Sequence, residues 1–147
     1  MKNMRNIPRI LIDTNVLLDF ISYREPHAEQ ANQLLLLCEN RLAYGCIAAH
    51  TIPDIFYILR KDFTSEELRE IMLNLCQSLR IVGVDAYKII AALENREFLD
   101  FEDCLQMQCA IDYHANYIIT RNCGDFAAST IPVMEPGAFL ALAEQGE

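Results

Sequence analysis

The sequence predicts an α/β fold in which helices cover both faces of a central parallel sheet, giving a three-layer α/β/α sandwich. Short apolar runs alternate along the chain with longer segments in which apolar residues recur at helical spacing. Strands that alternate with helices form parallel sheets, because each parallel neighbour is reached through a crossover that is usually a helix. We expect strands at 9–12, 42–49, 80–84, 117–120 and 131–134, and helices at 14–22, 27–41, 51–61, 65–79, 86–95, 101–115 and 135–145.

The first elements follow from the pattern of apolar residues. The run RILI at 9–12 is a short buried strand that ends at Asp13. Apolar residues at helical spacing predict the helices at 14–22 and 27–41, and the run LAYGCIAA at 42–49 predicts the next strand. Asp13 therefore stands where the first strand ends and the first helix begins.

Local start signals identify the next two helices. Pro53 falls in the first turn of the helix at 51–61, where its missing N–H is tolerated. Thr64 and Glu67 have the spacing of a capping box, which marks the start of the helix at 65–79.

Aspartates mark the helix starts in the second half of the chain. The run RIVGV at 80–84 predicts a strand, and Asp85 can cap the helix that follows. Asp100 can cap the helix at 101–115 in the same way. The runs YIIT and IPVM predict the last two strands, and EPGAFLALAEQ predicts a short closing helix.

Length and composition indicate one domain, residues 1–147, with a substantial hydrophobic core. Apolar residues make up 52% of the chain, which argues against disorder. No apolar run approaches the ~18 to 20 residues that a membrane span needs. The basic N-terminus has an apolar part too short for a secretion signal. We therefore expect a cytoplasmic protein that does not contact a membrane.

Charge and cysteine usage narrow the classes of function. With 12 basic and 21 acidic residues, the formal net charge is −9, which argues against broad, unassisted nucleic-acid binding. It leaves room for a nucleic-acid enzyme whose carboxylates are neutralised by a divalent metal. The six cysteines form no CxxC pair, and the three histidines are not spaced with them as zinc ligands, so we expect no zinc or disulfide site.

Four aspartates fall near one predicted edge of the sheet. Asp13 follows the first strand, Asp54 lies in the first turn of the helix after the second strand, Asp103 lies in the first turn of the helix before the fourth, and Asp125 lies in the loop after the fourth. Ligands of parallel sheets gather beyond the carboxyl ends of the strands, at a topological switch point. If the sheet is parallel, all four acids can converge there.

Each of these acids also has a purely structural interpretation. Asp13 can cap the first helix, Asp54 and Asp103 suit the first turns of their helices, and Asp125 can form an Asx-turn. Convergence would favour a metal, because two carboxylates ~4 Å apart repel by about 4 kcal/mol at an effective dielectric of 20. Oxygen-only ligands suit Mg²⁺ or Mn²⁺, which activate water and stabilise a phosphodiester under attack.

Three segments, ILIDTNVLLDF, TIPDIFYILRK and DFEDCLQMQCAIDYHANYIITRNCGDF, resemble a PIN domain, the fold of the VapC-like toxin ribonucleases. The resemblance covers nearly the whole chain in the family's order, and its most specific part is the pair DFEDCLQ and YIITRNCGDF. It implies a Rossmann-like sandwich and Mg²⁺- or Mn²⁺-dependent cleavage of RNA.

The resemblance assigns Asp13, Asp54, Asp103 and Asp125 to the catalytic acidic site, with Asp13, Asp103 and Asp125 as metal ligands. Many members have Glu where this chain has Asp54, and the shorter side chain would reach a metal through water. The resemblance further implies four supporting polar residues. Asn15 supports Asp13, and Thr120 and Asn122 lie around Asp125. Asp100 is either a further member of the site or only the cap of its helix.

Partners follow from the resemblance and from charge. Arg121 and Arg60 are the candidate phosphate-binding residues for an RNA substrate, and Arg121 lies beside the acidic cluster in the sequence. VapC-like toxins usually pair with a small antitoxin protein and often form dimers. The resemblance therefore implies an antitoxin partner and a homodimer for this chain.

Two alternatives remain open at this point. A phosphatase of the haloacid-dehalogenase type also begins with an Asp after its first strand, but it needs a second Asp where this chain has Asn15, and no catalytic Lys is evident. A PIN-like module that has lost catalysis could serve in binding, although the intact set of four acids argues against it. Phosphomonoester and RNA assays with metal and with chelator separate the three.

Overall fold

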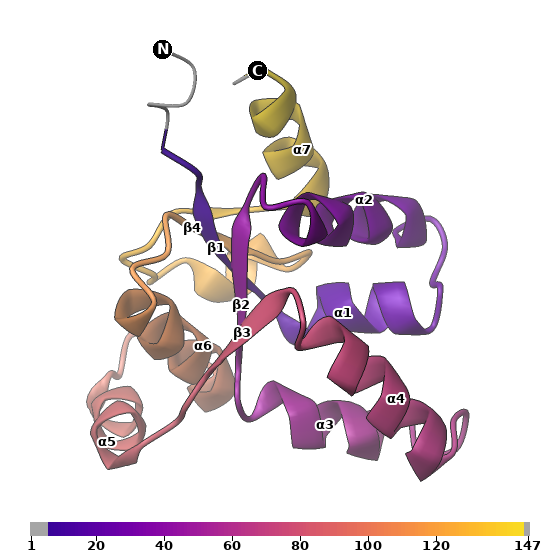
Figure 1. Ribbon diagram of the computed structural model, residues 1–147. Helices are drawn as coiled ribbons and strands as arrows, with labels where there is room; N and C mark the ends of the chain where they lie inside the picture. The colour runs from indigo at the N-terminus through magenta and orange to yellow at the C-terminus, as the bar shows by residue number, and fades with distance from the viewer. Residues whose placement is uncertain (1–5, 146–147) are drawn as a thin grey trace.

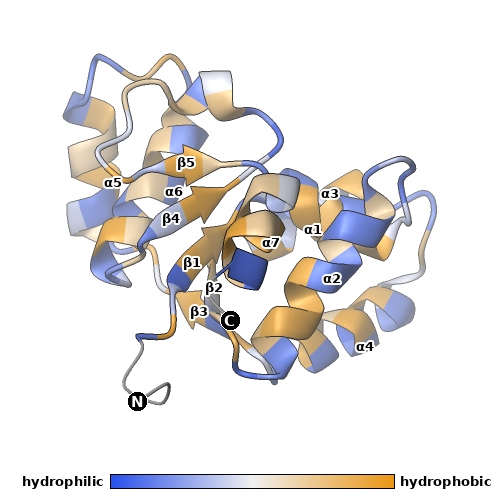
Figure 2. Ribbon diagram, turned by 90° about the horizontal axis from the view of Figure 1, so that it is seen from above, coloured by the Kyte–Doolittle hydropathy of each residue, from blue (hydrophilic) through white to orange (hydrophobic). Residues whose placement is uncertain are grey.

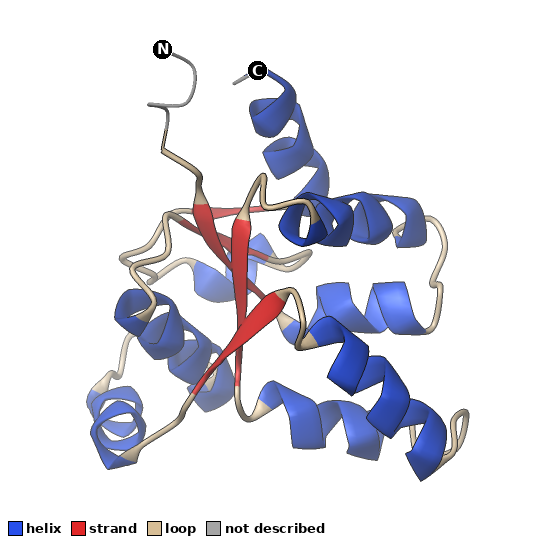
Figure 3. Cartoon of the chain, viewed as in Figure 1, coloured by secondary structure: helices blue, strands red, loops and turns tan. Residues whose placement is uncertain are grey.

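Five parallel strands form the central sheet of the computed structural model, which describes residues 6–145 (Figure 3). The strands are β1 (Arg9–Ile12), β2 (Tyr44–Ala48), β3 (Leu79–Val82), β4 (Tyr117–Ile119) and β5 (Val133–Met134). Their order is β3-β2-β1-β4-β5, and every neighbouring pair is parallel. The expected parallel sheet is therefore confirmed. Since the chain moves outward from β1 first on one side and then on the other, the switch point lies between β1 and β4.

Helices cover both faces of this sheet (Figure 1). They are α1 (Thr14–Ile21), α2 (Ala28–Glu39), α3 (Thr51–Ile58), α4 (Ser65–Leu75), α5 (Ala86–Glu94), α6 (Phe101–Asp112) and α7 (Pro136–Gln145), with a 3-10 turn at Cys123–Phe126. Seen from above, α5 and α6 lie on one side of the strands, and α1, α2, α3, α4 and α7 lie on the other (Figure 2). The predicted three-layer α/β/α sandwich is confirmed.

The alternation of side chains along β1 explains the two layers of core. Ile10 and Ile12 are fully buried in the cluster that includes side chains of α1, α2 and α4, whereas Leu11 is fully buried in the cluster that includes side chains of α6. Successive side chains of a strand point to opposite faces, so a central strand that is buried on both faces is apolar throughout.

The predicted helix starts are confirmed by their hydrogen bonds. Thr64 and Glu67 form the reciprocal capping box of α4. Asp85 and Asp100 each accept a hydrogen bond from the backbone amide three residues further on. These short-range contacts satisfy N–H groups that the first helical turn leaves free.

Four predicted helix ends are wrong by two to four residues. The helices expected at 27–41, 51–61, 65–79 and 101–115 end at Glu39, Ile58, Leu75 and Asp112. Just beyond the first and the last of these ends, Arg41 and His114 adopt positive φ angles of 62° and 59°, which turn the chain out of the helix. A glycine usually takes this conformation, so its absence hides these two ends in the sequence. No helix within residues 6–145 is long and apolar enough to cross a membrane.

Candidate functional site

The carboxyl ends of β1 and β4 place two polar side chains in contact. Ile12 pairs with Ile119, so the next residues, Asp13 and Thr120, leave the sheet side by side. Thr120 is fully buried, and its hydroxyl donates a hydrogen bond of 2.8 Å to the Asp13 carboxylate. The other oxygen of that carboxylate accepts a hydrogen bond from the Thr14 amide at 2.8 Å. Asp13, only 7% exposed, is therefore held at both oxygens.

Asn15 and Asn122 complete the surroundings of this pair. The Asn15 side-chain amide donates to the Thr120 hydroxyl at 3.1 Å and, more weakly, to Asp13 at 3.4 Å. The Asn122 backbone amide donates to the same hydroxyl at 3.0 Å. Thr120 thus hydrogen-bonds to Asp13, whereas the resemblance placed it around Asp125. The hydrogen bonds from Thr14, Asn15 and Thr120 together orient the Asp13 carboxylate.

Further carboxylates surround Asp13 and raise its pKa together with that of Asp103. Burial, followed by the charges of Asp100, Asp13, Asp125 and Glu102, raises the pKa of Asp103 to about 7. Burial also raises the pKa of Asp13, to which Asp125 and Asp100 add, while its hydrogen bonds act in the opposite direction. The structure therefore brings Asp13, Asp100, Asp103 and Asp125 into one region, although they come from three separate segments: the end of β1, the start of α6 and the loop after β4.

Asp54 approaches this region from α3, where it meets an acid that was not among the predicted site residues. Burial raises the pKa of Glu102, and the charge of Asp54 and a hydrogen bond with Asp54 raise it further. The charges of Asp100 and Asp13 also contribute. In the sequence Glu102 is an ordinary first-turn acid, favoured there by the helix dipole, so only the packing of α3 against α6 could show its role.

The donor set at this edge fits a hard divalent cation. It consists of carboxylate oxygens with hydroxyl and amide groups behind them, as Mg²⁺ and Mn²⁺ prefer. Within residues 6–145, the ion pairs use Lys88 and Arg121 and involve none of these acids, so no internal cation neutralises them. In the same part of the chain, no group of three or more His, Cys, Asp or Glu side chains is arranged so that it could hold a metal ion. The acids share a region without forming a closed coordination shell.

The two predicted phosphate-binding arginines make contacts within the protein. The Arg121 guanidinium pairs through two nitrogens with the carboxylate of Asp19, which lies on α1 and is almost fully buried. The Arg60 guanidinium lies 3.9 Å from the centre of the Tyr57 ring and donates to the Tyr57 carbonyl. Arg121 therefore ties the loop after β4 to α1, at the border of the acidic region.

Comparison with known proteins agrees with this geometry. Residues 9–124 match the family model of the PIN domain. The chain belongs to the PIN domain family. Members of this family are typically nucleases and generally use divalent metal ions. Asp13, Asp54 and Asp103 lie within the matched residues and Asp125 directly follows them. The assignment sets aside the haloacid-dehalogenase alternative.

Solved structures show the same PIN fold. A toxin–antitoxin complex from Klebsiella pneumoniae is 25% identical, with a TM-score of 0.65 over 86% of this chain and 97% of that one. VapBC2 from Rickettsia felis, bound to a promoter DNA fragment, is 20% identical, with a TM-score of 0.63 over 86% and 97%. FitAcB from Neisseria gonorrhoeae is 18% identical, with a TM-score of 0.61 over 87% and 98%. No curated protein matches this chain in sequence.

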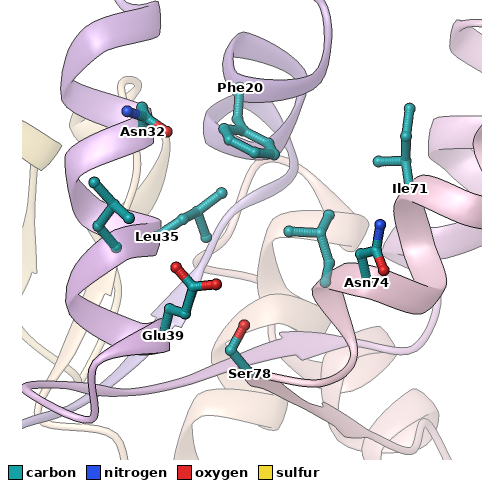
Figure 4. A pocket seen from close by; sticks show the side chains of 9 residues that line it. Phe20, Asn32, Leu35, Glu39, Ile71, Asn74 and Ser78 are labelled. Atoms are coloured by element: carbon teal, nitrogen blue, oxygen red, sulfur yellow. The ribbon is translucent and has the colours of Figure 1, made fainter.

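A separate cavity of the PIN domain lies between α1, α2 and α4, with a volume of about 270 Å³. Figure 4 shows Phe20, Leu35 and Ile71 lining it, with Glu39 and Ser78 at one end. None of the predicted site residues lines this cavity. Its mixed lining of apolar residues with Asn32, Glu39, Asn74 and Ser78 sets it apart chemically from the acidic edge.

Proposed function

We propose that this PIN domain is an endoribonuclease that hydrolyses RNA phosphodiester bonds with Mg²⁺ or Mn²⁺ as cofactor. The observation that supports this most directly is the gathering of Asp13, Asp103 and neighbouring acids at the switch point of the sheet, where burial and then the neighbouring charges raise the pKa of both aspartates. Carboxylates that disfavour one another's charge, and that have no basic side chain as partner, need a cation to stay ionised together. RNA, itself a polyanion, needs the same cation to approach them.

The residues of the site take distinct roles in this proposal. Asp13, Asp103 and Asp125 hold the cation, which when bound activates water and stabilises charge on the phosphodiester. Thr120 and Asn15 keep the Asp13 carboxylate aimed at the site through the hydrogen bonds described above. Asp54 and Glu102, which lie close enough for the charge of Asp54 to raise the pKa of Glu102, are further acids beside these ligands.

RNA cleavage with Mg²⁺, with Mn²⁺ and with chelator tests the proposal. We expect Asp13→Asn and Asp103→Asn to lose at least 10²-fold in metal-dependent activity, because each removes a charged ligand of the cation. Asp62→Asn, on the exposed turn before α4, is the matched control and should keep wild-type activity. Full activity in Asp13→Asn, or hydrolysis of phosphomonoesters alone, would contradict the assignment.

We also propose that Arg60 and Arg121 contact RNA phosphates through the parts of their guanidinium groups that remain exposed. Arg60 is exposed, and the Arg121 side chain is 25% exposed. Loss of a phosphate contact flattens the dependence of RNA affinity on salt. Arg60→Met should therefore reduce the salt slope, and an unchanged slope would exclude Arg60.

We further propose that the chain is the toxin of a toxin–antitoxin pair, that a small antitoxin protein binds it, and that it forms a homodimer. The support is the family and the likeness to the toxin–antitoxin complex from Klebsiella pneumoniae. Expression in bacteria should arrest growth, the Asp13→Asn variant should not, and co-expression of the reading frame beside its gene should restore growth.

Light scattering of the purified chain should give twice the chain mass. A monomer would contradict the proposed homodimer, and growth unaffected by the wild-type chain would contradict the proposed toxin role.

A further inference from the structure

A buried triangle of hydrogen bonds joins the three helices that carry Asp13, Asp54 and Asp103. The side-chain amide of Gln106 in α6 donates to the Thr51 hydroxyl of α3 at 3.1 Å and to the Thr14 hydroxyl of α1 at 3.4 Å. The two hydroxyls are themselves 3.1 Å apart, which closes the triangle. Gln106 is 2% exposed and Thr51 is fully buried.

Each corner of the triangle lies next to one of the acids along the chain. Thr14 directly follows Asp13, Thr51 lies one helical turn before Asp54, and Gln106 lies one turn after Asp103. Residues three apart share one side of a helix. A movement of any corner therefore displaces the acid beside it.

The triangle of hydrogen bonds leaves one buried polar atom of Gln106 without a partner. Among the described residues, the buried side-chain atoms that lack a hydrogen bond are the Gln106 Oε1 and both ring nitrogens of His50, which directly precedes Thr51. An unpartnered buried acceptor lowers stability, and an apolar residue of similar shape would avoid that loss. Packing alone therefore does not explain a glutamine at this position.

We propose that Gln106 is a positioning residue, which holds the first turns of α1 and α3 against α6 and so sets the spacing of the metal ligands Asp13 and Asp103, with Asp54 beside them. This inference rests on the proposed metal site. Groups that orient metal ligands from behind are worth about 10- to 100-fold in metal affinity when removed. Gln106 hydrogen-bonds to Thr14 and Thr51 rather than to the acids themselves, so it would act through the three helix starts that it joins.

Calorimetric titration of Mn²⁺ into the RNA-free protein tests the proposal. Gln106→Met keeps the size and loses the amide, and we expect it to weaken Mn²⁺ binding by about 10-fold or more. Its urea-unfolding midpoint should stay near that of wild type, because the two threonines still satisfy one another. Gln108→Met makes the same change two residues further on α6, where Gln108 is half-buried, and should alter neither quantity.

A second pair of variants examines the partner hydroxyl. Thr51→Val removes the hydroxyl and should weaken Mn²⁺ binding, whereas Thr51→Ser retains it and should restore the affinity. Met72→Ala, in the core of α4, serves as a control for loss of stability alone. Wild-type affinity in Gln106→Met, or an equal loss of affinity in Met72→Ala, would overturn the positioning role.

The two proposals can fail separately. If wild-type protein does not bind Mn²⁺, or if Asp103→Asn binds it unchanged, the metal site is refuted. Hydrogen exchange of the metal-free protein still decides the role of Gln106. Gln106→Met should speed amide exchange at residues 13–16 and at Thr51, Ile52 and Asp54 relative to Gln108→Met, and unchanged exchange would overturn the inference.

Discussion

At the scale of single residues, Arg121 shows that a charged side chain expected to contact substrate can also form an ion pair within the protein, here with Asp19. Arg121 has the position expected of a phosphate-binding residue, next to the acidic loop. Its guanidinium nevertheless pairs with an Asp19 side chain that is only 1% exposed. A buried carboxylate requires a partner, since its desolvation is not otherwise compensated.

Removal of that partner should be costly. Arg121→Met leaves the Asp19 charge buried and alone, and we expect it to lower the free energy of unfolding by about 3 to 5 kcal/mol. Arg24→Met, at an exposed position, is the control and should change it by less than about 0.5 kcal/mol. The double variant Asp19→Leu/Arg121→Met should recover much of the loss. Urea unfolding measures all three, and similar midpoints for Arg121→Met and Arg24→Met would refute the explanation.

At the scale of elements, the sequence reveals where helices start better than where they end. Three helix starts could be predicted from their capping residues, Thr64, Asp85 and Asp100. Capping depends on residues only three positions apart, so the sequence contains the whole signal. Arg41 and His114 end their helices with positive φ, a conformation that is uncommon in residues other than glycine and is therefore hard to predict from the sequence.

The same distinction holds for the candidate site. Asp13 and Asp103 could be placed from the sequence because strand ends and helix starts fix them. The contacts of Glu102 and Gln106 could not, because they depend on which helices pack together. The contact of Gln106 with Thr14 spans 92 positions of the chain, well beyond any local pattern.

At the scale of the whole molecule, the sheet and its two layers enclose most of the thiols. All six cysteines are free, and Cys38, Cys46, Cys104 and Cys109 are buried. Burial raises the pKa of Cys38 to about 12 and, with smaller charge effects, that of Cys109 to about 11. Near pH 8 these thiols are protonated and therefore poor nucleophiles.

Thiol labelling should consequently report on global unfolding. We expect a disulfide reagent at pH 8 to label Cys76 and Cys123, which are half-buried, before the other four. Buried cysteines such as Cys38 should react only in denaturant, at a rate that follows unfolding. Mass-spectrometric mapping of labelled peptides checks the order. Rapid native labelling of Cys46 would contradict it.

The placement of β1 at the centre of the sheet has a consequence for synthesis of the chain. The hydrogen bond between Thr120 and Asp13 joins residues 107 positions apart, and β4 supplies the neighbour that completes the surroundings of β1. A nascent chain emerges from its N-terminus, so Asp13 leaves the ribosome long before Thr120 exists. Until β4 has left the ribosome, Asp13 lacks its hydrogen bond from Thr120, and the acidic edge cannot form.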